Sequence, residues 1–245
     1  MILIPFASNE MNTLSEAFLQ SFRLIITLDA TLVEVVLLSL SVTFKAVSLA
    51  CLIGFPLGTA LAVLKFPGQR TLVVLFNSFM GLPPVVVGLV VYLILSANGP
   101  LGPLGLLYTP TAMIIAQTIL VTPIIVAHSR QIIVLLAEEY DETLRSMQAS
   151  RLDTMGTLLW DSRFSLFTTV LAGLGRAFSE VGAVMIVGGN INHFTRIMTT
   201  AIALQTARGD LALALGLGII LLILTISINA LAYGLKSSWE KHSYA

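Results

Sequence analysis

The chain concentrates its charge in one stretch, EEYDETLRSMQASRLDTMGTLLWDSR, which occupies residues 138–163. Nine charged side chains lie in this stretch, called the charged loop below, and apolar runs long enough to cross a bilayer flank it on both sides. A segment this polar between two membrane spans has to lie in water, because charges inside hydrocarbon are costly. The charged loop is therefore where the chain is expected to meet a soluble partner.

The composition places the rest of the chain in a membrane. Hydrophobic residues make up 56% of the 245 residues and charged residues 11%, and the mean hydropathy is +0.94. Soluble domains average about a quarter charged residues, so the sequence predicts an integral membrane protein. The net charge of zero gives no reason to expect nucleic acid as a partner. The single cysteine, Cys51, excludes a disulfide framework, and no metal-ligand spacing surrounds any histidine.

Five apolar runs have the length of a membrane helix, about 17–25 residues. They are Ala46–Leu64 with an apolar extension Val35–Phe44 before it, Thr71–Leu95, Pro110–Ala127 with a continuation to Ala137, Phe164–Gly189 and Leu211–Leu235. Gly and Pro residues in 96–109 predict a short outer loop between the second and third runs. The sequence therefore predicts an all-α membrane protein with about five transmembrane helices.

The N-terminal part of the chain is more polar than these runs. Apolar residues recur at helical spacing over Leu14–Leu28, but Glu16 and Arg23 lie among them. This pattern favours an amphipathic helix at the membrane surface, with a sixth span as the alternative. We therefore expect an N-terminal segment 1–34, a membrane domain 35–236 and a short tail 237–245.

The positions of Lys and Arg predict the orientation, because cytoplasmic loops carry an excess of both residues. If the charged loop is cytoplasmic, so are eight basic residues: Lys65, Arg70, Arg130, Arg145, Arg151, Arg163, Lys236 and Lys241. Only Arg23, Arg196 and Arg208 are then outside. We expect the N-terminus outside and the C-terminus in the cytoplasm, which agrees with an odd number of spans.

The charged loop itself has a helical pattern. Apolar residues recur every three or four positions as one stripe, formed by Leu136, Tyr140, Leu144, Met147, Met155 and Leu158 together with Arg151. The segment 148–153 predicts a turn that divides the loop into two short helices. Two interpretations remain open at this point: a docking element for a soluble partner, and a solvated hairpin that only connects two spans.

The charged loop resembles the cytoplasmic "EAA" loop of the permease subunits of ATP-binding-cassette importers. Glu142, Thr143 and Leu144 occupy the Glu-Ala-Ala positions, and Arg145, Ala149 and Ser150 match the surrounding pattern. Gln148 stands where the family has Gly, and Trp160-Asp161 stands where it has Leu-Pro. The resemblance implies that Glu142, Thr143, Leu144, Gln148, Ala149 and Ser150 couple the chain to an ATPase.

Three further segments resemble the permeases of oxyanion importers for molybdate, tungstate and sulfate. They are Arg176–Val184 (RAFSEVGAV), Met80–Gly88 (MGLPPVVVG), and Met185–Ile191 with Thr195–Leu204, and the last resembles the tungstate type. The resemblance covers roughly residues 30–236. It implies a type I importer permease fold in a bacterial or archaeal plasma membrane, with tungstate as the cargo and molybdate or sulfate as alternatives.

The same resemblance implies the partners. They are two ATPase subunits, an external binding protein that delivers the anion, and a second copy of this chain, because five spans alone enclose too little surface for a pathway. The chain contains no phosphate-binding G-x-x-x-x-G-K-[ST] loop, so it is not itself the ATPase. We expect no enzymatic activity and no cofactor.

Polar residues inside the spans are candidates for the translocation path. Arg176 and Glu180 lie four residues apart and on one helix face, where they form either a purely structural ion pair or a pair that changes partners during transport. Pro83 and Pro84 predict an irregular segment in the second span. Thr199 and Thr200, with Ser78 and Gln205, offer neutral hydrogen bonds to a passing anion. Ordinary helix–helix hydrogen bonds are the alternative for each of them.

A secondary transporter is the alternative from another functional class. Such a protein uses intramembrane carboxylates for ion coupling, and Glu180 is the one acidic residue available within the runs. No inverted repeat relates the two halves of the sequence. The importer permease is therefore the favoured hypothesis.

Overall fold

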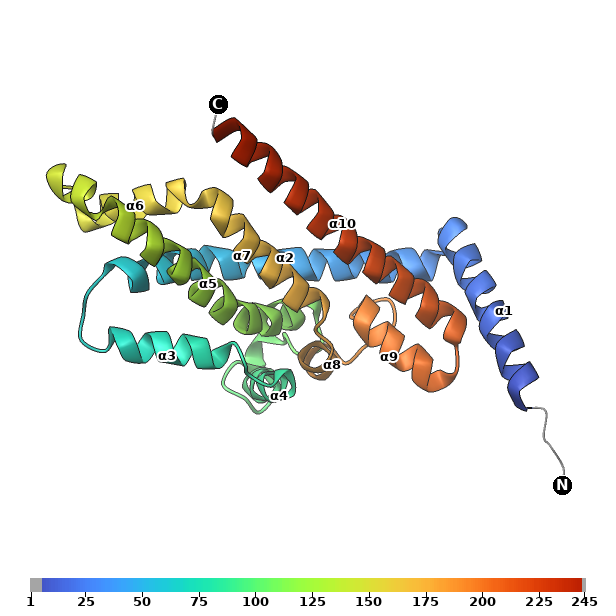
Figure 1. The fold of residues 1–245 in the computed structure, drawn as a ribbon. Coiled ribbons are helices and arrows are strands. Elements are labelled where there is room, and N and C mark those ends of the chain that lie inside the picture. Colours follow the sequence, from blue (N-terminus) through green and yellow to red (C-terminus); the bar gives the residue numbers. More distant parts are fainter. Residues whose placement is uncertain (1–5, 244–245) are drawn as a thin grey trace, which may run out of the picture.

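The structure is a computed structural model that describes the backbone of residues 6–243 and the side chains of residues 16–231 and Gly234. Within this part of the chain every regular element is helical (Figure 1). The α-helices are α1 (Phe6–Ile26), α2 (Ala30–Val63), α3 (Gln69–Phe79), α4 (Pro84–Leu95), α5 (Pro110–Ser146), α6 (Arg151–Asp161), α7 (Arg163–Phe178), α8 (Gly182–Gly188), α9 (Met198–Arg208) and α10 (Leu211–Ser243), and a 3-10 turn covers Gly102–Leu104. The predicted all-α class is confirmed.

Helices α2 and α5 form the centre of the molecule and run in parallel. Glycines on α2 allow the close approach: a Cβ at Gly54 would lie 2.6 Å from Ile125 Cγ2, and one at Gly58 would collide with Ser129 Oγ. Small residues are the usual means by which membrane helices approach closely. Figure 1 shows α6 at one end of this central pair and α9 toward the other, and these are called the α6 end and the α9 end below.

The number of helices and bent helix pairs that could cross a membrane agrees with the five predicted spans, with one correction. Three helices are long and apolar enough to cross a bilayer: α2, α5 and the Leu211–Leu231 part of α10. The other two predicted spans are each broken into a bent pair. The second is α3 and α4 at an angle of 104°, and the fourth, predicted without a break, is α7 and α8 at 60°. Prolines Pro83 and Pro84 lie at the first break, as the prediction of an irregular segment required.

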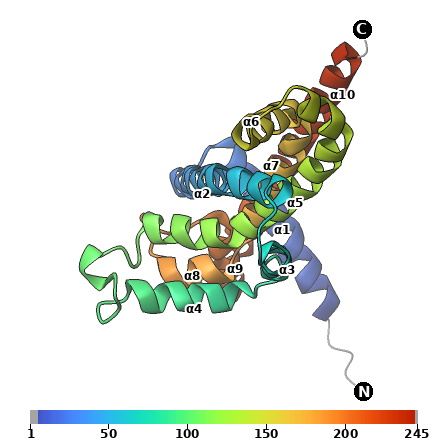
Figure 2. The same cartoon turned by 90° about the vertical axis from the view of Figure 1, so that its left-hand side faces the viewer.

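The two bent pairs pack against each other beyond their bends. Helices α4 and α8 lie side by side with the first part of α5 (Figure 2). A Cβ at Gly88 of α4 would lie 2.7 Å from Ala183 Cα, and one at Gly188 of α8 would lie 2.9 Å from Met113 of α5. The backbones of α4 and α8 therefore approach closely at Gly88, whereas Gly188 leaves room on α8 for the Met113 side chain of α5.

Several boundaries differ from the expected ones. Helix α2 begins at Ala30, before the first predicted run and its extension, and α10 continues to Ser243, beyond the end of the last predicted run at Leu235. Residues 138–146 are the last turns of α5, so the first half of the charged loop is not a separate short helix. Helix α9 lies in a region for which we predicted no helix.

Helix α1 is amphipathic, as predicted, and lies across the direction of α2 near the α9 end (Figure 1). Ala17 and Ser21 are buried on its side facing α10, where Gly216 lies opposite Ser21. Phe18, Leu19 and Phe22 are exposed. This distribution suits a helix lying on a membrane surface, and α1 is not among the candidate spans.

Candidate functional site

The turn between α5 and α6 is closed by backbone hydrogen bonds that surround Gln148. The Ala149 N–H donates to Leu144 O at 3.0 Å, and the Gln148 N–H donates to Arg145 O at 3.0 Å. This is the helix-terminating motif that places its central residue in the left-handed region, where Gly is preferred. Gln148 has φ +51°. The predicted turn is confirmed, and its geometry explains why a Gly is the expected residue at this position.

Helix α6 begins with a reciprocal cap. The Asp153 N–H donates to Ser150 Oγ at 3.2 Å, and the Ser150 N–H donates to the Asp153 carboxylate at 3.3 Å. This capping box satisfies the first amides of the helix. The cap and the preceding turn together hold α6 at a fixed angle to α5.

The residues predicted to couple to an ATPase gather at the α6 end. Glu142, Thr143, Gln148 and Ser150 are exposed, and Leu144 and Ala149 are half-buried. An open hollow of about 510 Å³ lies beside them; its lining includes Leu144, Gln148 and Ala149 and also Lys65, Glu138 and Asp141.

The apolar side chains of α6 are divided between two sides. Leu158, a member of the predicted stripe, is fully buried, so this part of the stripe packs inside the molecule rather than on a partner. The apolar residues that face outward are Leu152, which is 79% exposed, and Trp160, which is 68% exposed. We did not predict either residue as a contact with a partner. Their spacing of eight residues, slightly more than two helical turns, was visible in the sequence.

Replacing Gln148 with Gly is expected to raise the free energy of unfolding by about 1 kcal/mol, because Gly adopts the left-handed conformation without a Cβ penalty. The measurement is thermal unfolding of the purified protein in detergent. The control is Gln131→Gly at an exposed position inside α5, which should lower the same quantity by about 1 kcal/mol. Equal effects of the two substitutions would contradict this account of the turn.

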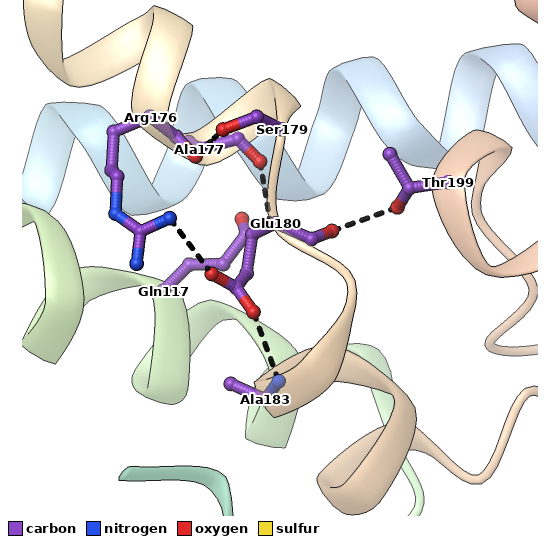
Figure 3. A network of polar contacts seen from close by, with 7 residues as sticks. All are labelled: Gln117, Arg176, Ala177, Ser179, Glu180, Ala183 and Thr199. Carbon is purple, nitrogen blue, oxygen red and sulfur yellow. Dashed lines mark hydrogen bonds and ion pairs between the residues drawn. The ribbon is translucent and has the colours of Figure 1, made fainter. Parts of the chain in front are cut away.

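The second candidate site lies inside the bundle, at the break between α7 and α8. Arg176 Nη1 lies 3.3 Å from Glu180 Oε2, and Glu180 is only 2% exposed whereas the Arg176 side chain is 27% exposed. Glu180 Oε1 accepts the Ala183 N–H of α8 at 2.9 Å. The Glu180 carbonyl accepts the Thr199 hydroxyl of α9 at 2.8 Å (Figure 3). One residue therefore connects α7, α8 and α9.

The break in α3–α4 meets the break in α7–α8. A Cβ at Gly182 would lie 2.9 Å from Val85 Cγ2, 3.6 Å from Val85 N and 3.8 Å from Glu180 Oε1. Pro84 occupies the first position of α4, where proline costs no backbone hydrogen bond. The structure thus brings Val85, the residue after Pro84, against Gly182, which lies two residues after Glu180.

The other predicted path residues have different environments. Thr200 is fully buried, and its hydroxyl accepts the Ile197 N–H at 3.2 Å, so it caps α9. Ser78 is exposed and donates to Val74 O of its own helix at 2.8 Å. Gln205 is buried at the far end of α9. Of this group, only Thr199 joins the Arg176–Glu180 site.

Gln117 belongs to this site and was missed by our sequence reasoning. It lies on α5, is 1% exposed, and donates from Nε2 to the Ala177 carbonyl at 3.3 Å. Its Oε1 is buried and has no hydrogen-bond partner among the described residues. The sequence feature that could have identified Gln117 is a polar glutamine within residues 71–129, a stretch that contains no charged residue.

A polar loop connects α8 to α9 at the α9 end. Arg196 donates from Nη1 to Asn192 Oδ1 at 2.8 Å, and burial, followed by the charge of Arg208, lowers the pKa of the Arg196 guanidinium. His193 Nδ1 lies 2.6 Å from Glu34 Oε2 of α2. No cluster of three metal-ligating side chains occurs among the residues whose side chains are described.

The chain matches one family model. The model describes a binding-protein-dependent transport system inner membrane component and matches residues 54–241. These residues include the charged loop and the polar site around Glu180.

Three relatives indicate the kind of protein that the chain is similar to. The tungstate uptake system permease protein TupB of Peptoclostridium acidaminophilum is 37% identical over 226 residues, 92% of this chain and 99% of the relative. A probable anion ABC transporter permease protein of Haloferax volcanii is 39% identical over 205 residues, 82% of this chain and 88% of the relative. A sulfate transport system permease protein CysW of Synechococcus elongatus is 27% identical over 211 residues, 81% of this chain and 71% of the relative.

Proposed function

The chain belongs to the family of inner membrane components of binding-protein-dependent transport systems, and we propose that it is the permease subunit of an ATP-driven importer that carries tungstate into the cytoplasm. The observation that carries the proposal is the 37% identity to a tungstate uptake permease across 92% of this chain and 99% of that relative. Sulfate permeases are more distant, at 27% identity for the one from Synechococcus elongatus. Sulfate and molybdate are the alternative cargoes.

The α6 end is proposed as the docking surface for ATPase subunits. Glu142, Thr143, Gln148 and Ser150 are exposed there, beside the half-buried Leu144 and Ala149. The outward-facing Leu152 and Trp160 add exposed apolar side chains to this surface, and tryptophan is enriched at protein–protein interfaces. Because the cap and the closed turn hold α6 in place, a displacement of α6 by a bound partner also displaces the ends of α5 and α7. This end is proposed to face the cytoplasm, with the N-terminus outside.

The path for the anion is proposed to pass the junction of the two bent pairs, beside Pro83, Pro84, Arg176, Glu180 and Thr199, with Thr200 supporting it from within α9. A second copy of the chain is proposed to complete the pathway. The proposed contact with that copy is the outer face of α4, where Val85, Val86, Leu89, Val90 and Leu93 are exposed. That face begins at the junction, so a partner covering it would border the polar site.

The proposed complex contains two permease copies, two ATPase subunits and an external binding protein. It is tested by reconstituting the chain with its ATPase and binding protein in vesicles and measuring vesicle tungsten after ATP addition by mass spectrometry. ATP-dependent accumulation that excess molybdate or sulfate reduces only weakly would support tungstate as the cargo. Accumulation of sulfate without tungstate would contradict the cargo and leave the permease assignment in place.

A further inference from the structure

Gln117 is a buried polar side chain whose hydrogen bonds are incomplete. Its Nε2 donates to the Ala177 carbonyl at 3.3 Å, and its Oε1 has no partner among the described residues. The orientation of the amide follows from chemistry, because only the NH2 group can donate to a carbonyl. The group left without a partner is therefore an acceptor. A buried acceptor of this kind is costly, and in a native protein it calls for an explanation.

The Arg176 cation is connected to Gln117 through Glu180 and the Ala177 carbonyl. The Glu180 N–H also donates to the Ala177 carbonyl, at 3.3 Å, so Gln117 and Glu180 meet at one oxygen atom. Arg176 Nη1 lies 3.3 Å from Glu180 Oε2, and a guanidinium carries five N–H donors, more than this one contact uses. Figure 3 shows the Gln117 side chain beside the Arg176 guanidinium and the Glu180 carboxylate.

Glu180 also lies where a rearrangement would take place. It follows the end of α7, and its carboxylate joins Arg176 of α7 to the first turn of α8 across the 60° bend. A change in that bend alters the distance between the Arg176 guanidinium and the Ala183 N–H, which the Glu180 carboxylate bridges in this arrangement. A guanidinium released without another partner would be an unpaired charge within a membrane span, which is unfavourable.

We propose that Gln117 is a positioning residue for transport, whose Oε1 receives the Arg176 guanidinium when the Arg176–Glu180 pair opens. The exchange keeps the cation hydrogen-bonded in both arrangements and frees the Glu180 carboxylate to move with α8. The role of Gln117 rests on the proposed function, because it assigns a step within transport. In the arrangement seen here the acceptor remains unused, which accounts for its incomplete hydrogen bonding.

The test compares three variants with wild type in the reconstituted complex. Gln117→Leu removes the acceptor. Gln117→Glu adds a carboxylate that competes permanently with Glu180 for Arg176. The double variant Gln117→Glu with Glu180→Gln moves the carboxylate from one side of Arg176 to the other. Thr118→Val is the control, because Thr118 is the next residue on α5 and its hydroxyl also contacts another helix, at Ala46 O, 3.3 Å away.

Anion uptake and ATP hydrolysis are measured at matched amounts of folded protein. Gln117→Leu and Gln117→Glu should each lower the maximal uptake rate about tenfold, with KM unchanged and with ATP hydrolysis reduced less than uptake. The double variant should recover uptake at least about threefold over Gln117→Glu. Thr118→Val should transport like wild type.

Two results would overturn the role of Gln117: wild-type uptake by Gln117→Leu, or no recovery in a folded double variant. An error in the proposed cargo would be recognised separately, because the wild-type complex itself would then import another oxyanion instead of tungstate. The variants are compared with wild type on whichever anion the wild-type complex imports, so the test of Gln117 remains decisive in that case.

Discussion

Uptake is expected to be abolished by Glu180→Leu, and the free energy of unfolding should fall by about 3–5 kcal/mol. That is the usual cost of removing one partner of a buried ion pair. Glu180 is 2% exposed, and the substitution leaves the Arg176 guanidinium without its anion and the Ala183 N–H without its acceptor. The measurements are tungstate uptake in vesicles and thermal unfolding in detergent.

The more conservative Glu180→Gln separates stability from transport. A glutamine retains an acceptor for the Ala183 N–H but carries no charge for Arg176, so it should lose most of the uptake with a smaller loss of stability. The control is Asp141→Asn, which breaks the exposed Arg145–Asp141 pair on α5 and should change the free energy of unfolding by less than about 0.5 kcal/mol. Unchanged transport by Glu180→Gln would remove the Glu180 charge from the mechanism.

Gly58→Ala is expected to lower the free energy of unfolding by about 1–3 kcal/mol, the usual cost of overpacking. A Cβ at Gly58 would lie 2.8 Å from the Val126 carbonyl oxygen and would collide with Ser129 Oγ. Ser129 cannot turn away freely, because its hydroxyl donates to Ile125 O at 2.6 Å. Helices α2 and α5 would therefore have to separate, and Gly58→Leu should have a larger effect.

The matched control for Gly58→Ala is Gly175→Ala in α7. Apart from the adjacent backbone of α7 itself, no described atom lies within 4 Å of a Cβ built on Gly175, so the only expected effect is the gain in helix propensity, up to about 1 kcal/mol. The two substitutions are chemically identical and should have opposite signs in thermal unfolding. A stabilising effect at Gly58 would contradict the close α2–α5 contact.

The sequence was informative where charge or backbone chemistry interrupted an apolar run. The turn at Gln148 followed from a change in pattern, and the contact between Arg176 and Glu180 followed from their spacing and from the cost of charges in a membrane. The docking and path roles given to these residues stay predictions. Five spans followed from length alone, since about 20 apolar residues cross a bilayer.

The bends and the packing could not be predicted in the same way. Thr71–Leu95 is apolar almost throughout, so it has no polar face from which to infer a 104° bend between α3 and α4. The bend is stabilised by contacts distant in sequence, such as Gly88 with Ala183. Gln117 was missed because a neutral residue in an apolar run resembles ordinary packing until its neighbours are known. Helix α9 was missed because it is short and mixes polar with apolar residues.

The contact between Gly88 and Ala183 also has a consequence for how the protein is made. When the ribosome delivers α3 and α4 to the bilayer, α8 is still roughly a hundred residues from being synthesised, which takes about 5–20 s. During that interval nothing from the later part of the chain holds α4 at its sharp angle, and α3 and α4 are free to adopt other angles about the break at Pro83 and Pro84. The early half of the membrane domain therefore acquires its final shape only after the later half has been inserted.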